Sequence, residues 1–357
     1  MRVTAIVWMI VYHVIVLNHH PGFIATVLRI PGRMGWIGSE FFFVIAGYFC
    51  YLLVASRPQA RVKHSAALVK RVFRIMVPYT VFLGLYLTVG LKLERMVGNN
   101  FVLSQGYLQS LFTFTTNFRL AIGPFSGVAL EGFFSVAIGV QLFLLLTVIF
   151  KIVTLPSRRI AILLSLLFIA IVLRIIFHNR TPWFIYFFTF TRMDAFIIGA
   201  LLGLLHTLDA TKTFMMKNKG KVLFVGGLVF LVIFVVTKGL YIQLPLTHQL
   251  GYPGVSLAVA SLMNYAINSE SNRFFQGLGS MGKFSFSVYL VKLPLIWLVY
   301  SLLESLLVNP DGDTFIIVFL FSSLLLCFGF AYLWYNIIEC PLGRLSAAFI
   351  FRKRKSP

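Results

Sequence analysis

Long apolar runs separated by short polar connections dominate this chain of 357 residues. A run of about 20 apolar residues can cross a bilayer as a helix, and we count about ten such runs. They lie near residues 3–19, 36–55, 75–94, 129–150, 159–177, 183–205, 222–237, 250–267, 284–303 and 314–338. The pattern predicts an all-α, polytopic membrane protein with about ten transmembrane helices.

The composition also indicates a membrane protein, and the chain shows no sign of a boundary between domains. Hydrophobic residues make up 59% of the chain and charged residues 11%, which is far more apolar than a soluble globular protein. No internal repeat, low-complexity tract or long linker splits the chain, so we expect one transmembrane domain at residues 1–345 and a basic cytoplasmic tail at 346–357. A cleaved signal peptide is an alternative for the first run, but no small-residue cleavage pattern follows it.

The formal net charge of +21 is unevenly distributed between alternate connections. With a cytoplasmic N-terminus, the inner side holds 21 of the 31 lysines and arginines and the outer side holds 8, among them Arg174. Arg192 and Lys292 remain inside predicted spans. This asymmetry follows the positive-inside rule for an even number of helices with both termini cytoplasmic. The charge therefore reflects membrane topology and not affinity for nucleic acid.

His13, in the first predicted span, is the most informative single residue. An ionisable group at bilayer depth is costly and marks a functional site by default. Arg2 precedes it by eleven residues, which corresponds to about 16 Å along a helix. An arginine at one membrane face and a histidine near the middle of the bilayer would then lie on one helix, where a single ligand could touch both.

Four acidic residues also fall at membrane depth or at its edge. They are Glu40, Glu131, Asp194 and Glu339. Such residues normally face the bundle interior and pair with other groups. One interpretation is that they neutralise structural partners such as Arg192 or Lys292. The other is that, together with His13, they supply a general base and the carboxylate that orients it.

Arg71 and Arg74 form a pair spaced by three residues at the start of the third span, which places both guanidinium groups on one helix face. They could hold phosphate groups in a forked geometry, or they could anchor the helix to anionic membrane lipids. Gly199 and Gly203, in the span that carries Asp194, are spaced for close helix packing.

Metal, disulfide and nucleotide sites are not predicted. His19 and His20 lack a carboxylate or cysteine at ligand spacing, and the three cysteines have no CxxC or Cys/His pattern. The string GLGSMG at 277–282 matches a phosphate-loop pattern, but it precedes an apolar helix in a chain without alternating strands.

Several strings, taken in order, resemble the acyltransferase-3 family of integral-membrane acyltransferases, whose bacterial members acylate cell-surface glycans. They are Arg2 and His13 with ten residues between them, GWIGSEFFFVIAGYF around Glu40, the pair Arg71 and Arg74, Glu131 in VALEGFF, Arg192 with Gly199, MGKFSFSVYLVKLP around Lys292, and Glu339 with Pro341. The resemblance extends over nearly the whole chain. Lys292 stands where many members have a second histidine, Glu40 replaces the more usual aspartate, and the tryptophan that commonly precedes the middle glutamate is absent.

The resemblance implies an O-acyltransferase of the bacterial plasma (inner) membrane that moves an acyl group, acetyl above all, from cytoplasmic acyl-CoA to a hydroxyl of a polysaccharide or its lipid-linked precursor. Arg2, Arg71 and Arg74 would bind the donor phosphates. His13 would accept the hydroxyl proton or form an acyl-histidine, and Glu40 would orient the imidazole. Outer aromatic residues such as Trp36 and Trp183 could stack on sugar rings or form an interfacial belt.

A secondary transporter or flippase for a glycan or lipid intermediate is the alternative. Intramembrane carboxylates and a histidine would then form a proton relay. Against it, the chain shows no repeat of the kind that many transporters carry.

Overall fold

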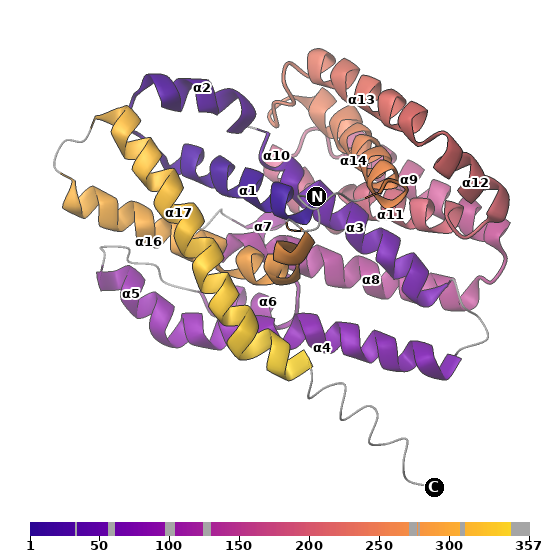
Figure 1. Cartoon of the computed structure of the whole chain (residues 1–357), viewed down its shortest axis with the longest axis horizontal. Coiled ribbons are helices and arrows are strands. Elements are labelled where there is room, and N and C mark those ends of the chain that lie inside the picture. The colour runs from indigo at the N-terminus through magenta and orange to yellow at the C-terminus, as the bar shows by residue number, and fades with distance from the viewer. Residues whose placement is uncertain are drawn as a thin grey trace, which may run out of the picture.

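The computed structural model describes residues 1–32, 34–55, 61–96, 104–123, 130–270, 277, 279–307 and 311–343, without the side chains of residues 30, 31, 61–71 and 131. These ranges are helical and contain no strand (Figure 1). The α-helices are α1 Arg2–Leu17, α2 Phe23–Gly32, α3 Ile37–Val54, α4 Arg61–Leu85, α5 Leu91–Met96, α6 Gln105–Phe112, α7 Thr116–Ile122, α8 Phe134–Ile152, α9 Pro156–Ile176, α10 Pro182–Phe187, α11 Asp194–Leu205, α12 Asp209–Lys217, α13 Lys219–Val236, α14 Tyr252–Ile267, α16 Ser285–Leu306 and α17 Gly312–Trp334.

Short π-helical and 3₁₀ segments interrupt these helices. The π-helical segments are η2 Tyr86–Gly90, η5 Thr247–Gly251 and η7 Tyr335–Glu339, and the 3₁₀ segments are η3 Glu131–Phe133, η4 Thr189–Thr191 and η6 Gly282–Phe284. Single π-helical turns are rare in proteins, and many of those that do occur lie at functional sites. Here η7 ends on Glu339, one of the candidate residues.

The membrane-spanning character is confirmed, but the count of about ten helices is not. Among the described residues, seven helices are long and apolar enough to cross a membrane, or eight if the pair α11 and α12, bent by 103°, forms one broken span. The other predicted runs give shorter helices: α1 and α14 have 16 residues each. The run at 183–205 breaks into α10, η4 and α11. The cytoplasmic location of both termini stays a prediction, and the tail at 346–357 lies outside the described residues.

Helices α3 and α11 pack more extensively than any other pair of described elements. Their contact depends on glycine: a Cβ atom added at Gly47 would lie 1.9 Å from the carbonyl oxygen of Phe196, and one at Gly199 would lie 2.0 Å from that of Val44. Gly203 likewise faces the Tyr48 carbonyl oxygen, 2.9 Å from an added Cβ. The predicted packing role of Gly199 and Gly203 is confirmed, because only small residues let two backbones approach this closely.

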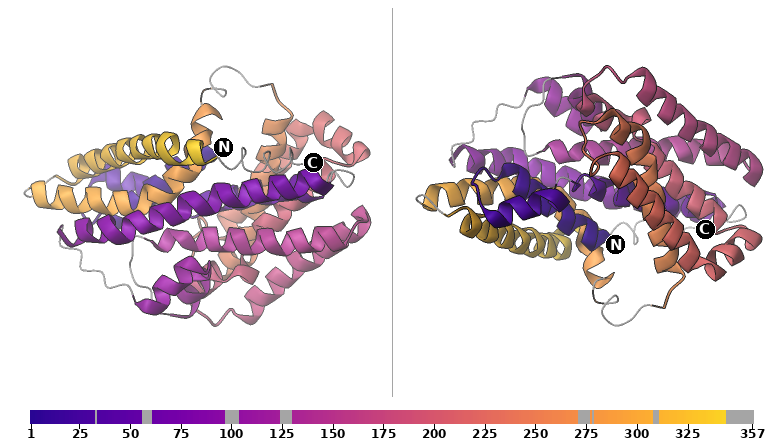
Figure 2. Two further views of the ribbon diagram at one scale, coloured as in Figure 1. Left: turned by 90° about the horizontal axis from the view of Figure 1, so that it is seen from below. Right: turned by 90° about the horizontal axis from the view of Figure 1, so that it is seen from above.

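The remaining helices surround this pair. Helix α14 packs on both α3 and α11, while α1 packs on α3, α16 and α17 (Figure 2). Helix α13 packs on α14 along one side, and only Gly226 is buried, as expected for a helix whose other side faces lipid. The connection after α5 contains α6 and α7, and Asn117 of α7 donates a hydrogen bond of 2.8 Å to Thr189 of η4. Helix α7 is therefore fixed to the bundle at η4.

Candidate active site

Glu40 and Arg192 form an ion pair at the α3–α11 contact, and both side chains are fully buried. Glu40 is in the first turn of α3, and Arg192 lies two residues before the start of α11. Ser256 of α14 donates a hydrogen bond of 3.2 Å to Glu40. The guanidinium also lies 4.1 Å from the ring centre of Tyr252 and 4.9 Å from that of Tyr186, within cation–π range. Two aromatic rings and a hydroxyl thus surround one buried charge pair.

A second buried ion pair lies beside the first. Arg174 of α9 pairs with Asp194 at 3.0 Å and donates a further hydrogen bond of 2.7 Å to the carbonyl oxygen of Thr191. The Tyr252 ring lies between the two pairs, since its centre is also 5.6 Å from the Arg174 guanidinium. The two arginines and two carboxylates cancel in formal charge, which reduces the cost of holding them away from water.

These contacts bear on two expectations made from the sequence. Glu40 does pair with Arg192, one of the two cations expected as partners of the acidic residues, while its role in catalysis stays a prediction. Arg174, assigned from the sequence to the outer surface, is in fact 1% exposed and is the partner of Asp194. Trp36 is 3% exposed and packs on Tyr252 with ring centres 5.2 Å apart, so it belongs to the interior and not to an outer aromatic belt.

His13 of α1 has its own orienting partner. Its Nδ1 donates a hydrogen bond of 2.5 Å to the carbonyl oxygen of Met9, one turn earlier in the helix. Because a carbonyl oxygen only accepts hydrogen bonds, the ring proton is on Nδ1 and Nε2 keeps a free lone pair. The group that orients this imidazole is thus a backbone carbonyl, whereas the hydrogen bonds of Glu40 go to Arg192 and Ser256.

Lys292 of α16 lies within electrostatic range of His13. Helices α1 and α16 pack together, and Lys292 is 2% exposed. Its ammonium is 4.5 Å from the centre of the Tyr289 ring. The histidine and lysine that the sequence placed in separate spans therefore share one interior region.

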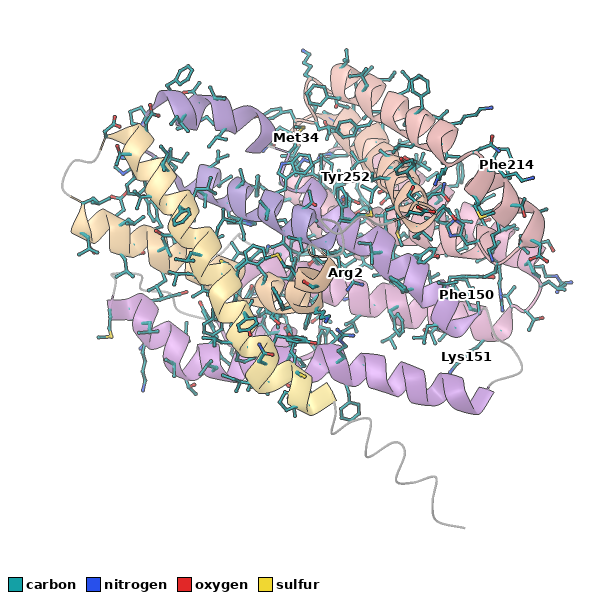
Figure 3. All side chains as sticks on the ribbon, in the orientation of Figure 1. Arg2, Met34, Phe150, Lys151, Phe214 and Tyr252 are labelled. Atoms are coloured by element: carbon teal, nitrogen blue, oxygen red, sulfur yellow. The ribbon has the colours of Figure 1, made fainter. Side chains whose placement is uncertain are left out.

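Arg2, Arg74 and Glu339 come together at the other end of α1. Arg74 interacts electrostatically with both Arg2 and Glu339, and Ser287 of α16 donates a hydrogen bond of 2.6 Å to Glu339. Figure 3 places Arg2 near the middle of the long axis, whereas Lys151 at the end of α8 lies toward one edge. Arg2 is half-buried, so the cationic end of α1 is partly shielded from solvent.

Two further candidates cannot be placed in full. Arg71 precedes Arg74 by one turn in α4, and Glu131 begins η3, but the side chains of both lie outside the described part of the chain. Gly132, which follows Glu131, packs against Lys292, since a Cβ added there would lie 3.9 Å from the lysine Nζ. The backbone next to Glu131 is thus close to the region that His13 and Lys292 share.

Three residues of this interior escaped the sequence analysis: Ser256, Tyr252 and His248. Tyr252 has an apolar neighbourhood in sequence and resembles any other aromatic residue of a span. His248 Nε2 and the Tyr252 hydroxyl are buried and lack a hydrogen-bond partner among the described residues. Two of the three lie at or beside η5, and the available signal was a histidine at the start of a short apolar run, three residues after Pro245 and three before Gly251.

A family model described as an acyltransferase domain, that of the acyltransferase-3 family, matches residues 1–334. No curated protein and no solved structure gives a match to the chain.

Proposed function

Because the chain belongs to the acyltransferase-3 family, we propose that this membrane acyltransferase moves an acetyl group from cytoplasmic acetyl-CoA to a hydroxyl of a cell-surface polysaccharide or its lipid-linked precursor. The proposed location is the bacterial plasma membrane, where both substrates can be reached. The observation that carries the proposal is His13, whose Nδ1 is bound to Met9 so that Nε2 is free to accept a proton.

In the proposed reaction, His13 Nε2 removes the proton of the acceptor hydroxyl as its oxygen attacks the thioester carbonyl carbon. The carbon–sulfur bond then breaks, the electron pair goes to sulfur, and His13 returns the proton to the thiolate. Atoms and charge balance without a further reactant. Direct transfer needs one base, and an acyl-histidine route would use the same Nε2 atom as nucleophile.

The donor would bind at the cationic end of α1. Arg2 of α1 and Arg74 of α4 lie within electrostatic range of each other, and Arg71 precedes Arg74 by about one turn in the sequence of α4. Guanidinium groups suit phosphates because they donate two parallel hydrogen bonds. Arg2 lies about 16 Å from His13 along α1, so a donor bound by its phosphates would need a flexible arm to bring the thioester to the imidazole.

Glu40 takes a different role in this proposal from the one its motif suggests. Its ion pair with Arg192 and its hydrogen bond to Ser256 join α3, α11 and α14. Asp194 and Arg174 extend this network to α9. We assign these four residues to positioning the bundle around α1, and we assign Glu339 to the cationic end of α1, where it partly balances Arg74.

The test combines glycan mass spectrometry with transfer by purified protein. Cells that carry wild type, a deletion or His13→Ala are compared, with the amount of each protein in the membrane measured. We expect an acetyl mass increment on the surface glycan only with wild type. With purified protein, label from acetyl-labelled CoA should enter glycan extracted from the deletion strain, at a rate about 10²–10⁴ times lower for His13→Ala.

Normal transfer by a properly inserted His13→Ala protein would contradict the assignment of the base. A glycan that keeps its acyl groups in the deletion strain, but falls in amount outside while a precursor accumulates inside, would favour the transporter instead.

A further inference from the structure

Lys292 differs from the other buried cations of the protein. Four lysine or arginine side chains are buried among the described residues: Arg159, Arg174, Arg192 and Lys292. Arg174 and Arg192 each pair with a buried carboxylate, and Arg159 donates hydrogen bonds to three backbone carbonyls. Lys292 has no ion pair with any of the carboxylates whose side chains the structure describes. It is therefore the buried cation whose charged group has neither an ion pair nor a hydrogen bond to another described residue, whereas the Arg159 guanidinium at least has its three carbonyl acceptors.

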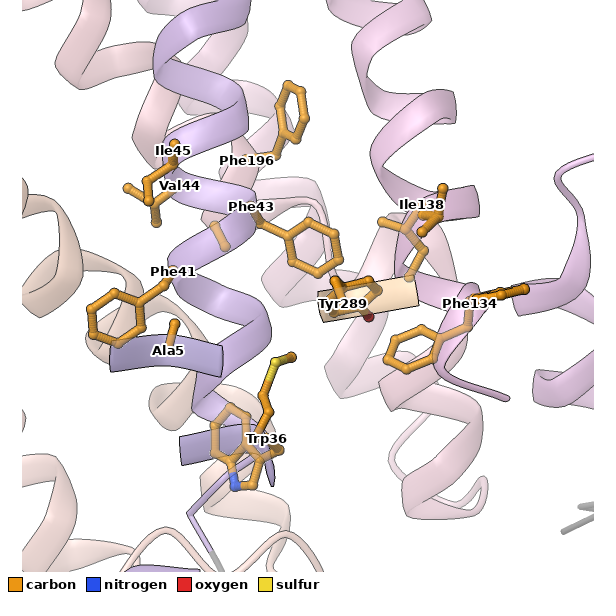
Figure 4. Packing of buried hydrophobic residues seen from close by; sticks show 14 of the residues in the cluster. Ala5, Trp36, Phe41, Phe43, Val44, Ile45, Phe134, Ile138, Phe196 and Tyr289 are labelled. Carbon is orange, nitrogen blue, oxygen red and sulfur yellow. The ribbon is translucent and has the colours of Figure 1, made fainter. Parts of the chain in front are cut away.

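The contacts of Lys292 fix its position without neutralising it. The Tyr289 ring lies beneath the ammonium at 4.5 Å, and the Tyr289 hydroxyl donates a hydrogen bond of 2.8 Å to the Gly132 carbonyl and contacts Ser135. Figure 4 places Tyr289 between Phe43 of α3 and the first turns of α8. A cation–π contact contributes about 0.5–2 kcal/mol, whereas burying an ion costs several kcal/mol. A charge held at such a net cost calls for a functional explanation.

The position of Lys292 near His13 suggests a functional explanation for this buried charge. His13 gains a positive charge when it takes the hydroxyl proton, and this is unfavourable beside an ammonium unless negative charge develops at the same moment. Attack on a thioester creates that charge, because the carbonyl π electrons move to oxygen as the new carbon–oxygen bond forms. The imidazole takes up the positive charge of this step. The ammonium lies in the same interior region, where it can stabilise the negative charge on the carbonyl oxygen.

We propose that Lys292 is a catalytic residue whose ammonium stabilises the oxyanion formed when the acceptor hydroxyl, deprotonated by His13, attacks the thioester. The proposal rests on the acyl transfer proposed above. The ammonium keeps all its protons throughout: the hydroxyl proton goes to His13 and then to the departing sulfur. Tyr289 is the positioning residue that holds the ammonium in place.

Lys292→Met tests the proposal because it separates catalysis from stability. Methionine has a similar length and no charge, so it removes an uncompensated buried ion and should leave the melting midpoint in detergent unchanged or higher. We expect kcat for transfer from acetyl-CoA to fall about 10²–10³-fold, with the KM for acetyl-CoA nearly unchanged. Lys283→Met, at an exposed lysine just before α16, is the matched control and should behave as wild type.

Lys292→Arg provides the second measurement. Arginine keeps the positive charge, so its kcat should exceed that of Lys292→Met by at least about tenfold. Equal rates for the two variants would overturn the proposal, as would normal transfer by Lys292→Met or a loss of its activity in parallel with its stability, which would make Lys292 a structural residue. If the wild-type protein transferred no acetyl group, the proposed function itself would be contradicted. That result is distinguishable from the outcomes above, in which the wild type is active and only the role of Lys292 is overturned.

Discussion

Replacing Arg192 with methionine should destabilise the protein, because it leaves the Glu40 carboxylate buried without its ion-pair partner. Both side chains are fully buried, and the remaining hydrogen bond of Glu40, from Ser256, is 3.2 Å long. Removing one partner of a buried pair costs about 3–5 kcal/mol. Methionine can fill the space between the Tyr252 and Tyr186 rings, so we attribute the expected loss to the unpaired charge and not to a cavity.

The double variant Glu40→Gln with Arg192→Met isolates the charge effect. It removes both ions, and replacing a buried pair by neutral groups is often close to neutral for stability. Unfolding in detergent micelles is measured for wild type, Glu40→Gln, Arg192→Met and the double variant. We expect the double variant to be more stable than Arg192→Met, with a coupling free energy of about 2 kcal/mol or more.

Simple additivity of the two single changes would refute this reasoning, since it would mean that Glu40 and Arg192 do not stabilise each other. Arg158→Met, at an exposed arginine in α9, is the control for the loss of an arginine and should change stability by less than about 0.5 kcal/mol.

Three further outcomes are expected. Gly199→Ala should destabilise the protein by at least about 1–3 kcal/mol in thermal unfolding, because the new Cβ would meet the backbone of α3, whereas Gly139→Ala, with nothing within 4 Å, should be neutral or stabilising. Arg74→Ala should weaken acetyl-CoA binding about tenfold in isothermal titration, and unchanged binding would make Arg74 a topology anchor; Arg158→Ala is its control. Arg159→Met should cost at least about 2 kcal/mol, since it leaves three carbonyls without their donor, and a wild-type melting midpoint would contradict this.

The long spans were predictable because uninterrupted apolar length is itself the signal. Helices α3, α8, α9 and α17 coincide with predicted runs. The run at 183–205 was misjudged because η4 is only three residues long, so a hydropathy window of about 20 residues averages it with the apolar residues on both sides. The sequences of the shorter helices α1 and α14 are as apolar as those of full spans. Average hydropathy over a window of residues reports composition and does not locate the end of a helix.

The partners of the charged residues were only partly predictable. Arg192 was one of two cations expected to pair with acidic residues, and it pairs with Glu40. Arg174 resembled an outer-loop charge because it ends an apolar run, and its contact with Asp194 depends on how α9 packs against α11. His13 and Glu40 are on successive spans, but sequence does not set the rotation of one helix against the next, and this rotation decides which side chains meet.

The glycine contact between α3 and α11 has a consequence for motion. Where two backbones touch at Gly47 and Gly199, the helices interlock without flexible side chains between them, and the buried Glu40–Arg192 pair ties the same boundary. Sliding or separation there would expose both ions and break the contact, so α3 and α11 move as one rigid body. Any opening that admits a donor or an acceptor must therefore come from other helices moving against a fixed centre, such as α1, which packs on α3, and α16 and α17, which pack on α1.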